Sequence, residues 1–442
     1  MAAVVRPAAG VVPELSVITR VPGVPPRTRV LLIAPHSSYR ITPFLNAARQ
    51  LGADVLIASQ GEHSLVSAIA AGLRIDLQDH DAALQLILAA AQQQPFSAVI
   101  GTDDSTVELA SRVAAALGLA HNPPHSACVT RRKDLARAEL QRAGVPVPWH
   151  QCVDLTQPFE SQCQDVPFPC VAKPLALSAS RGVIRADNTD ELKVACERIR
   201  EIIANEETIE ERTLVLVEQY IPGREVALEG LLHDGTLQVL ALFDKPDPLE
   251  GPYFEETYYI TPSRFEQSMQ ALARTRVAQA CAAYGLRTGP VHAELRIHEG
   301  EAWVLEVAAR TIGGQCARLL RFGTGYGLEE QVIAQALGQP LTPNTENGAA
   351  GVLMIPIPSG GVLRRVEGML TAQRVLYIED IEISVREGYE LVPLPEGASY
   401  LGFIFARAPT PELAEQALRE AHACLNIVVA PVWKVGSGAG ME

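Results

Sequence analysis

The sequence of 442 residues lacks several features that would define a class of protein at once. No apolar run approaches the roughly 18–20 residues that a membrane-spanning helix needs. The eight cysteines are scattered along the chain and form no CxxC pair, which argues against a zinc site and against a disulfide scaffold. We therefore expect a cytoplasmic protein with reduced thiols and no membrane partner.

The start of the chain also lacks the features of a signal peptide. Residues 1–28 are small and apolar, but five prolines interrupt them. They offer neither a basic first segment nor a continuous hydrophobic one. We expect this stretch to be a flexible N-terminal arm.

Basic residues are fewer than acidic residues in this chain. The chain has 37 Lys+Arg against 51 Asp+Glu, a formal net charge of −14. Such a balance makes nucleic acid an unlikely main partner. It does not exclude a nucleotide bound through a metal ion, because carboxylates are the groups that hold such a metal. No GxGxxG follows any expected strand, so a dinucleotide site is not supported.

What is present predicts a multidomain α/β and α+β protein, since 48% of the residues are hydrophobic. From residue 29, short apolar runs at 30–34, 55–59 and 98–101 alternate with helical stretches, which favours a parallel, Rossmann-like sheet. Further on, an expected helix at 133–143 precedes strands at 170–173 and 214–219, and antiparallel strands follow at 225–232, 236–244 and 253–261. We predict four parts: the arm, a Rossmann-like domain at 29–125, a second domain at 126–340 with a small lid at about 150–215, and an α+β domain at 349–442.

The most informative stretch is the alternating sequence 291–307, which predicts a β-hairpin. If residues 299–301 form its loop, Glu294 and Glu306 lie on one rung and one face, with Cβ atoms about 5 Å apart. The other face then carries Ala293, Leu295, Ile297, Trp303, Leu305 and Val307. Two carboxylates that close repel by about 3 kcal/mol at an effective dielectric of 20. A divalent cation would offset that repulsion; the alternative is a solvated pair on an exposed ribbon.

Three further motifs bear polar groups at the ends of strands. Arg310, followed by Gly313 and Gly314, suits an anionic intermediate, although a surface arginine would read the same. Lys173 ends an apolar strand before a loop of small residues, an arrangement that can hold phosphate oxygens but also fits a surface lysine. A third strand turns at 222–223 and leaves Glu218 and Glu225 on either side of the turn.

Together and in this order, these motifs resemble the ATP-grasp superfamily over about residues 133–337. The segments 243–246, 251–256, 261–263 and 383–402 look most like those of the L-amino-acid ligases, which join amino acids into dipeptides. The resemblance implies an ATP-grasp fold with a lid, and ATP and Mg²⁺ (or Mn²⁺) as cofactors. It implies phosphate contacts from Lys133, Lys173 and the lid loop with Ser178, Ser180 and Gly182, nucleotide contacts from Glu218, Gln219, Tyr220, Ile221 and Glu225, and Mg²⁺ bound by Glu294 and Glu306.

The resemblance also implies how the reaction is helped. Arg310 would stabilise the transferring phosphoryl group and contact the substrate, with the amides of Gly313 and Gly314 beside it. Lys245 is a candidate for contact with the acyl-phosphate. Glu255 and Glu256 are candidates for binding a substrate ammonium, and ordinary exposed carboxylates are the alternative. His36 and Asp103 lie near strand ends of the first domain, where helix caps and turn residues explain them better.

Two departures from the family pattern stand out. Ala308 replaces the asparagine that commonly follows the second metal glutamate, which leaves a second Mg²⁺ less well held. The lid loop has only Gly182, so its closure is expected to be stiffer.

The sequence thus predicts a ligase that joins a small-molecule carboxylate to an amine through an acyl-phosphate, with amino acids as substrates and a homodimer as the default assembly. The alternatives are an enzyme activating formate or bicarbonate and a non-catalytic ATP-binding regulatory protein.

Overall fold

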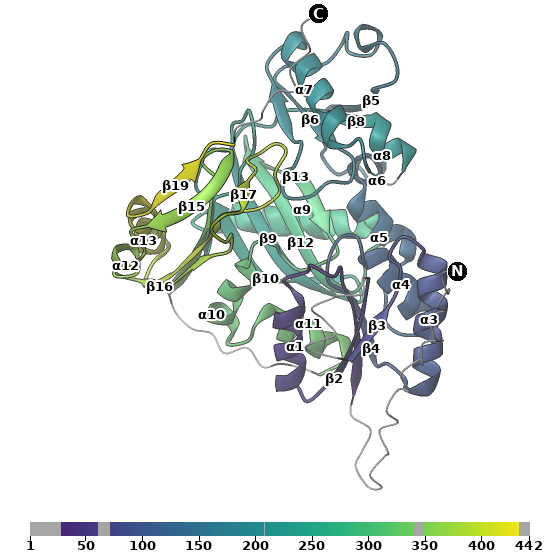
Figure 1. Cartoon of the computed structure of the whole chain (residues 1–442). Helices are drawn as coiled ribbons and strands as arrows, with labels where there is room; N and C mark the ends of the chain where they lie inside the picture. The colour runs from purple at the N-terminus through teal and green to yellow at the C-terminus, as the bar shows by residue number, and fades with distance from the viewer. Residues whose placement is uncertain (1–27, 61–70, 207, 340, 342–347, 433–442) are drawn as a thin grey trace, which may run out of the picture.

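The computed structural model describes residues 28–60, 71–206, 208–339, 341 and 348–432. Apart from residue 28, the predicted N-terminal arm lies outside these residues. Three regions surround the middle of the molecule: an N-terminal domain, a small lid, and a large central sheet that runs on into the C-terminal region (Figure 1). In the part of the chain that the structure describes, no helix is long and apolar enough to cross a membrane.

The N-terminal domain is built on a parallel sheet in the order β3-β2-β1-β4. Its strands are β1 (Arg29–Ile33), β2 (Asp54–Ser59), β3 (Ala71–Arg74) and β4 (Ala98–Gly101), and its helices are α1 (Ile41–Gln50), α3 (His80–Gln93) and α4 (Val107–Ala116). Parallel sheets need cover on both faces, which explains why Val30 to Ile33 are fully buried. The three predicted strands are confirmed; β3 was not predicted.

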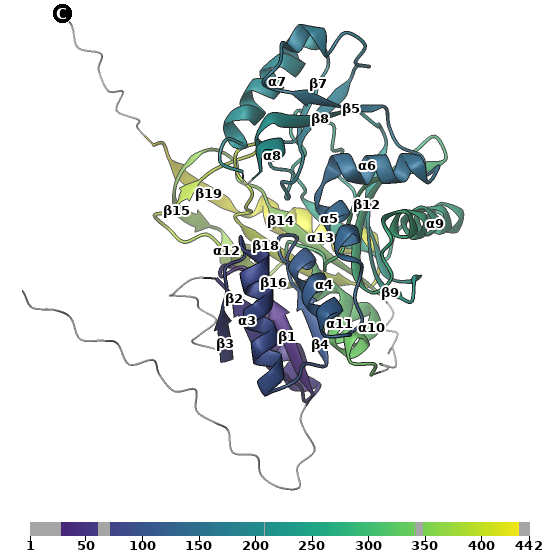
Figure 2. The ribbon, with the colours of Figure 1, turned by 90° about the vertical axis from the view of Figure 1, so that its right-hand side faces the viewer.

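The lid is an antiparallel sheet in the order β5-β8-β6-β7. It comprises β5 (His150–Asp154), β6 (Cys170–Pro174), β7 (Ile184–Ala186), β8 (Leu214–Gln219), a 3-10 turn η1 (Phe159–Ser161), α7 (Thr189–Ile202) and α8 (Ile209–Thr213). Helix α7 begins where the Asn188 side chain accepts a hydrogen bond from the backbone N–H of Glu191. Two helices, α5 (Pro124–Arg131) and α6 (Lys133–Arg142), lead from the N-terminal domain into the lid (Figure 2).

The central sheet has eight strands in the order β13-β12-β9-β10-β11-β14-β18-β16. These are β9 (Arg224–His233), β10 (Thr236–Lys245), β11 (Tyr258–Thr261), β12 (Gly289–His298), β13 (Glu301–Ala308), β14 (Ala349–Ile355), β16 (Ile378–Ile383) and β18 (Gly402–Ala408). The strand predicted at 253–261 is shorter than expected, because residues 254–257 leave the sheet and only 258–261 pair with β14. The sheet therefore continues without a break from β11 into the C-terminal region.

Helices cover this sheet on both sides. Helix α9 (Gln267–Tyr284) packs on β12 and β13, and α13 (Pro411–Ala423) packs on β14 and β18. The turn η2 (Cys316–Leu319) with α10 (Leu320–Thr324) and α11 (Leu328–Ala336) joins the N-terminal domain in one apolar core. The C-terminal region adds α12 (Met369–Ala372) and a small sheet of β17 (Glu390–Leu391), β15 (Gly361–Glu367) and β19 (Asn426–Ala430).

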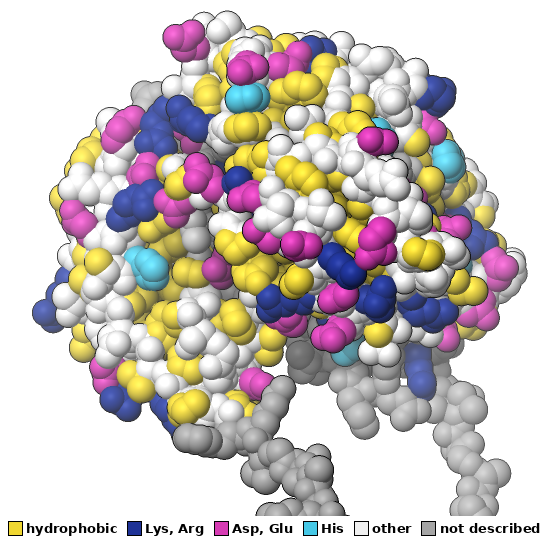
Figure 3. All heavy atoms as spheres, turned by 90° about the horizontal axis from the view of Figure 1, so that it is seen from above, with side chains coloured by type: hydrophobic (Ala, Val, Ile, Leu, Met, Phe, Trp, Pro, Cys, Tyr) yellow, Lys and Arg dark blue, Asp and Glu magenta, His cyan; other side chains and the backbone are white. Residues whose placement is uncertain are grey.

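The surface seen from above carries charges of both signs. Lys and Arg side chains are interspersed with Asp and Glu on that face, with no broad stripe of one sign (Figure 3).

Candidate active site

A cavity of about 1000 Å³ lies where the lid, the N-terminal domain and the central sheet meet. Its wall includes most of the residues that the sequence singled out. These are Lys133, Lys173, Ser178, Ser180, Glu218, Gln219, Tyr220, Ile221, Glu225, Glu256, Glu294, Glu306, Arg310, Gly313 and Gly314. Gly182, Lys245 and Glu255 are not on the wall. One space therefore collects groups that are spread over about 180 residues of sequence.

The two glutamates of the hairpin are paired as predicted, but by a different route. Glu294 lies opposite Glu306, while His298 lies opposite Glu301, so the loop has two residues rather than the three we expected. Positive φ angles at Glu299 (49°) and Gly300 (75°) suit such a tight turn. A bulge at Leu305 then adds one residue to β13 and restores the predicted pairing.

Because of the bulge, the apolar face of the hairpin differs from the one predicted. Beyond it, the side chains of β13 exchange faces, because successive residues of a strand point to opposite sides. Val304 and Ala302 are buried in the core against α9, and Trp303 and Leu305 are not among its buried residues. Ala293, Leu295 and Val307 are buried there as predicted, with Ile297 packed at the margin.

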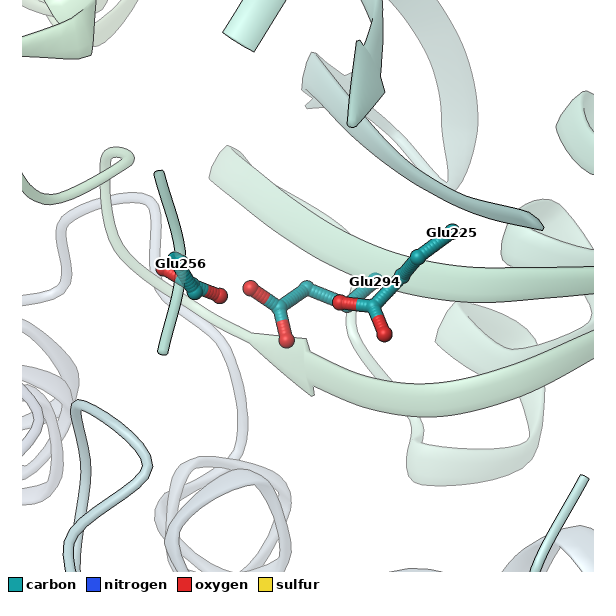
Figure 4. A group of neighbouring side chains, drawn as sticks. All are labelled: Glu225, Glu256 and Glu294. Atoms are coloured by element: carbon teal, nitrogen blue, oxygen red, sulfur yellow. The ribbon is translucent and has the colours of Figure 1, made fainter. Parts of the chain in front are cut away.

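Three glutamates from separate segments converge beside this hairpin. Carboxylate oxygens of Glu225 on β9, Glu256 after β10 and Glu294 on β12 lie within 4.8 Å of one another (Figure 4). The buried ammonium of Lys245 contacts all three, at 2.8 Å from Glu225, 2.7 Å from Glu256 and 3.1 Å from Glu294. Carboxylates grouped in this way are the donor set that Mg²⁺ prefers.

The electrostatics of this cluster are unequal. Burial and the neighbouring charge of Glu294 raise the pKa of Glu256 to about 7. Burial opposes ionisation of Glu294 too, but Lys245 and His292 outweigh it and hold the pKa of Glu294 well below its usual range. Crowding of this kind is what a divalent cation would relieve, so the residues present fit a metal ion.

The sequence did not predict a buried pair next to Glu294, formed by His292 and Glu229. His292 Nδ1 lies 3.2 Å from Glu229 Oε2, and His292 Nε2 lies 3.6 Å from Glu294 Oε1. Burial would lower the pKa of His292, but its bonds to Glu229 and Glu294 outweigh burial and raise the pKa to about 9. A protonated His292 thus supports the ionised form of Glu294. Alternation along β9 and β12 was the available signal, since it places Glu229 and His292 on the face of Glu225 and Glu294.

The lysines predicted to meet phosphates both line the cavity. Lys173 bonds to Glu218, whose carboxylate also receives Arg137. Burial would raise the pKa of Glu218, but Arg137 and Lys173 outweigh it and lower the pKa to about 2. Lys133 Nζ donates to the carbonyl of Leu177 at 2.6 Å and lies 3.6 Å from Glu306 Oε2. Glu218 therefore holds Lys173 in place rather than offering a free carboxylate.

An apolar slot lies next to the predicted adenine segment. Val171, Tyr220, Leu249 and Phe254 form a small buried cluster, and all four line the cavity. Arg296 closes its end, donating to the carbonyl of Ile221 at 2.9 Å and to Glu225 at 3.1 Å. The guanidinium of Arg296 also lies over the rings of Tyr220 and Phe254, 5.0 and 5.6 Å from their centroids, so this part of the wall combines apolar surface with a cation.

The N-terminal domain contributes Asp104 to the site, and Asp104 binds Arg310, which follows β13. The guanidinium nitrogens Nε and Nη2 of Arg310 both lie 3.0 Å from the carboxylate of Asp104. The amide of Gly314 donates to the Tyr39 hydroxyl at 3.0 Å, so this predicted amide is already engaged. Asp104 was missed because no local pattern marks it. Asp103 lies on the wall, but its carboxylate accepts bonds from Ser38, Thr102 and Arg40.

Two contacts join the lid to the C-terminal region, and we call them the latch. One is between Gly182 and Pro395, and the other is between Arg198 and Glu396. The amide of Gly182 donates to the Pro395 carbonyl at 2.9 Å. Arg198 pairs with the Glu396 carboxylate at 2.5 and 2.9 Å. Gly182 therefore ties the lid loop to the C-terminal region without lining the cavity, and Glu255, also off the wall, accepts the amide of Ile357 at 3.3 Å.

Comparisons with known proteins agree with this geometry. The ATP-grasp N-terminal domain model matches residues 45–121, the ATP-grasp domain model matches 166–318, and the L-amino acid ligase C-terminal domain 2 model matches 353–430. The chain belongs to the ATP-grasp superfamily. Within it, the C-terminal domain is the one that L-amino acid ligases carry.

Individual relatives are distant. The uncharacterized protein y4rH of Sinorhizobium fredii is 23% identical over 360 residues, 81% of this chain and 73% of the relative. The alanine--anticapsin ligase of Bacillus subtilis is 24% identical over 256 residues, 53% of this chain and 54% of that ligase, so the match spans about half of it. The structure of an L-amino acid ligase from Bacillus licheniformis shares the fold, with a TM-score of 0.76, 24% identity, and 92% of this chain and 100% of that chain covered.

Proposed function

We propose that the protein is an ATP- and Mg²⁺-dependent carboxylate–amine ligase that joins amino acids through an amide bond. The observation that carries this proposal is the cavity itself. Lys133 and Lys173 lie on its wall, as do the paired Glu294 and Glu306 and the guanidinium of Arg310. Cations for phosphates, carboxylates for a metal and a cation for an anionic intermediate are the three requirements of phosphoryl transfer to a carboxylate.

The proposed roles follow from position. Tyr220 and the apolar slot would receive the adenine, with Gln219 and Ile221 at its rim and Glu225 toward the ribose. Lys133, Lys173 and the loop with Ser178 and Ser180 would hold the phosphates. Glu294 and Glu306 would hold Mg²⁺. Mg²⁺ bound there supplies charge neutralisation for the phosphates.

The reaction balances as ATP + acid + amine → ADP + phosphate + amide. An oxygen of the acid attacks the γ-phosphorus, ADP leaves, and an acyl-phosphate forms. The amine then attacks the acyl carbon and phosphate departs, while Arg310 stabilises the negative charge of both steps. The lid, held by its latch, would exclude water that would otherwise hydrolyse the intermediate.

Amino acids are the substrates we favour. The C-terminal domain is of the type named for L-amino acid ligases, and the relative named alanine--anticapsin ligase points the same way. Glu256 would bind a substrate ammonium, a role supported by the position of its carboxylate on the cavity wall, where it also contacts Lys245 and the Tyr259 hydroxyl. We also propose that the enzyme is cytoplasmic and forms a homodimer. Size-exclusion chromatography with light scattering tests the homodimer.

The experiment is a screen of amino-acid pairs for phosphate release with ATP and Mg²⁺, beside a Glu306→Ala control. We expect release that requires an acid and an amine together and disappears in the control, with the dipeptide identified by mass spectrometry.

Other outcomes would redirect the proposal. Release with formate or bicarbonate in place of an amino acid would favour the carboxylating alternative. Tight ATP binding without any release would favour a regulatory protein. Trapping with hydroxylamine separates the two half-reactions, because an acyl-phosphate yields a hydroxamate without an amine substrate.

A further inference from the structure

Arg40 is a cavity residue that the proposed roles leave unused. It directly precedes α1 in the N-terminal domain, lines the cavity, and is only 8% exposed. Its guanidinium lies beside Gly313, the first of the two glycines that follow Arg310. A Cβ atom added at Gly313 would lie 3.3 Å from Arg40 Nη2 and 3.4 Å from the Tyr39 hydroxyl. The bare backbone of Gly313 thus leaves Arg40 close to the place where the acyl carbon would react.

The hydrogen bonding of Arg40 is incomplete. Nη1 donates to Asp103 Oδ1 at 2.5 Å, but the buried Nε has no hydrogen-bond partner among the described residues. A guanidinium has five N–H donors, and a buried donor without an acceptor costs free energy. Asp103 cannot complete the set, because Ser38 and Thr102 already donate to its other oxygen at 2.7 and 2.5 Å.

The neighbouring arginine is committed differently. Arg310 donates to both oxygens of Asp104 and to the carbonyl of Thr311. Asp104 and Asp103 are adjacent in sequence, and each holds one guanidinium. Both cations therefore lie at the cavity. Asp104 binds Arg310 through Nε and Nη2, whereas Asp103 binds Arg40 through Nη1 and leaves its Nε without a partner among the described residues.

The geometry points to a ligand for the guanidinium edge of Arg40 that carries Nη2, the nitrogen beside Gly313. Resting on the function proposed above, we propose that Arg40 binds the free carboxylate of the acceptor amino acid, whose amine attacks the acyl-phosphate. In an α-amino acid the amine nitrogen and the carboxyl carbon are only two bonds apart. A receptor for that carboxylate must therefore adjoin the groups that stabilise the reacting carbon, and Arg40 beside Gly313 meets this condition. Guanidinium groups suit planar carboxylates.

The first test needs no variant. Acceptor amino acids are compared with their carboxamides in the wild-type enzyme, with the same acid, ATP and Mg²⁺. We expect kcat/KM to fall about 10- to 100-fold for the carboxamide, the loss typical of a charge-assisted hydrogen bond. Equal use of the two acceptors would overturn the proposal.

The second test uses Arg40→Met and Arg40→Lys, with Arg112→Met as the matched control. Arg112 pairs with Asp81 in the same domain, away from the cavity wall. For Arg40→Met we expect KM for the acceptor to rise about 10- to 100-fold and the preference over the carboxamide to vanish. KM for ATP and hydroxamate formation from the acid should stay within about twofold of wild type, since neither involves the acceptor. Arg40→Lys should recover part of the preference.

The remaining outcomes are decisive in other ways. Equal losses with the amino acid and the carboxamide would assign Arg40 a structural role at α1, and lost hydroxamate formation would assign it to the phosphates; either overturns the proposal. If Arg40→Met does not fold, Arg40→Lys and the wild-type comparison still decide. Hydroxamate formation absent in the wild type would instead refute the function proposed above.

Discussion

The two walls of the cavity compensate the charge of buried carboxylates in different ways. On the lid side, one carboxylate, Glu218, lies between two cations, Arg137 and Lys173. On the sheet side, the carboxylates of Glu225, Glu256 and Glu294 surround the ammonium of Lys245, while Arg296 lies 3.1 Å from Glu225 and His292 lies 3.6 Å from Glu294. The first arrangement fixes a lysine. The second shares three carboxylates among several cations and keeps them on the cavity wall, where they are candidates for binding a metal ion.

The sharpest way to break the sheet-side arrangement is Lys245→Met. Removing one member of a buried ionic cluster leaves the others uncompensated, so we expect the free energy of unfolding to fall by about 3–5 kcal/mol. Urea denaturation measures it. The control is Lys193→Met, because Lys193 pairs with Glu160 at the exposed surface and its loss should leave the free energy of unfolding nearly unchanged. Similar losses in the two variants would contradict this view of Lys245.

The lid-side arrangement is tested by pH with Glu218→Gln. The folded-state pKa of Glu218 is about 2 against 4.5 when unperturbed. The stabilisation from its ionised form is thus fully present above about pH 4.5 and is lost as the pH falls toward 2. We expect Glu218→Gln to be less stable than wild type by on the order of 3 kcal/mol at pH 7, with the difference shrinking at pH 4 and pH 3. A difference that stays constant with pH would argue against it.

The three carboxylates that line the cavity on the sheet side predict stabilisation by Mg²⁺. At a hundredfold excess over its dissociation constant, a ligand of the folded state adds about 2.7 kcal/mol to the free energy of unfolding. We expect Mg²⁺ to raise the melting temperature of the wild type and EDTA to reverse the rise, with no effect in Glu294→Gln. Glu301→Gln, on the same hairpin but paired with Arg276, should keep the effect. An unchanged response in Glu294→Gln would exclude that residue as a metal ligand.

The smallest expected effect concerns the latch between the walls. Arg198 and Glu396 are both partly exposed, at 38% and 42% of their side chains, so their pair should contribute only about 0.2–1 kcal/mol. A double-mutant cycle of Arg198→Ala and Glu396→Ala, read out as KM for ATP, should show coupling of that size. Each single variant should also release more phosphate without product. Strictly additive effects would show that the pair does not hold the lid.

Local patterns predicted the elements of the site better than its contacts. The strands predicted at 225–232 and 236–244 are confirmed as β9 and β10, and a two-residue turn with positive φ angles at Asp234 (48°) and Gly235 (82°) joins them. Glu294 and Glu306 were paired correctly although the loop was counted wrongly, because the bulge at Leu305 compensated for the shorter loop. A bulge leaves no mark in an alternating sequence, so Trp303 and Leu305 were assigned to the wrong face.

Contacts between distant segments were beyond the reach of the sequence. Asp104 meets Arg310 across 206 residues, and Glu229 meets His292 across 63. Nothing near Asp104 or Arg310 predicts their contact, and alternation places Glu229 and His292 on polar faces without predicting that their strands pair. Lys245 was expected near the acyl-phosphate, yet it lies beneath the wall, because three carboxylates from separate segments draw its ammonium inward. The roles we assign to individual residues stay predictions until the variants are measured.

The continuity of the central sheet has a consequence for engineering. Strand β11 pairs along residues 258–261 with β14, the first strand of the predicted C-terminal domain. A protein cut at residue 348 would leave the backbone N–H and C=O groups of that edge unpaired and invite aggregation. It would also uncover Tyr258 and Ile260, which are buried against that domain. Grafting the C-terminal domain between ligases of different specificity should therefore move β11 together with β14, treating the strand pair rather than the linker as the exchangeable unit.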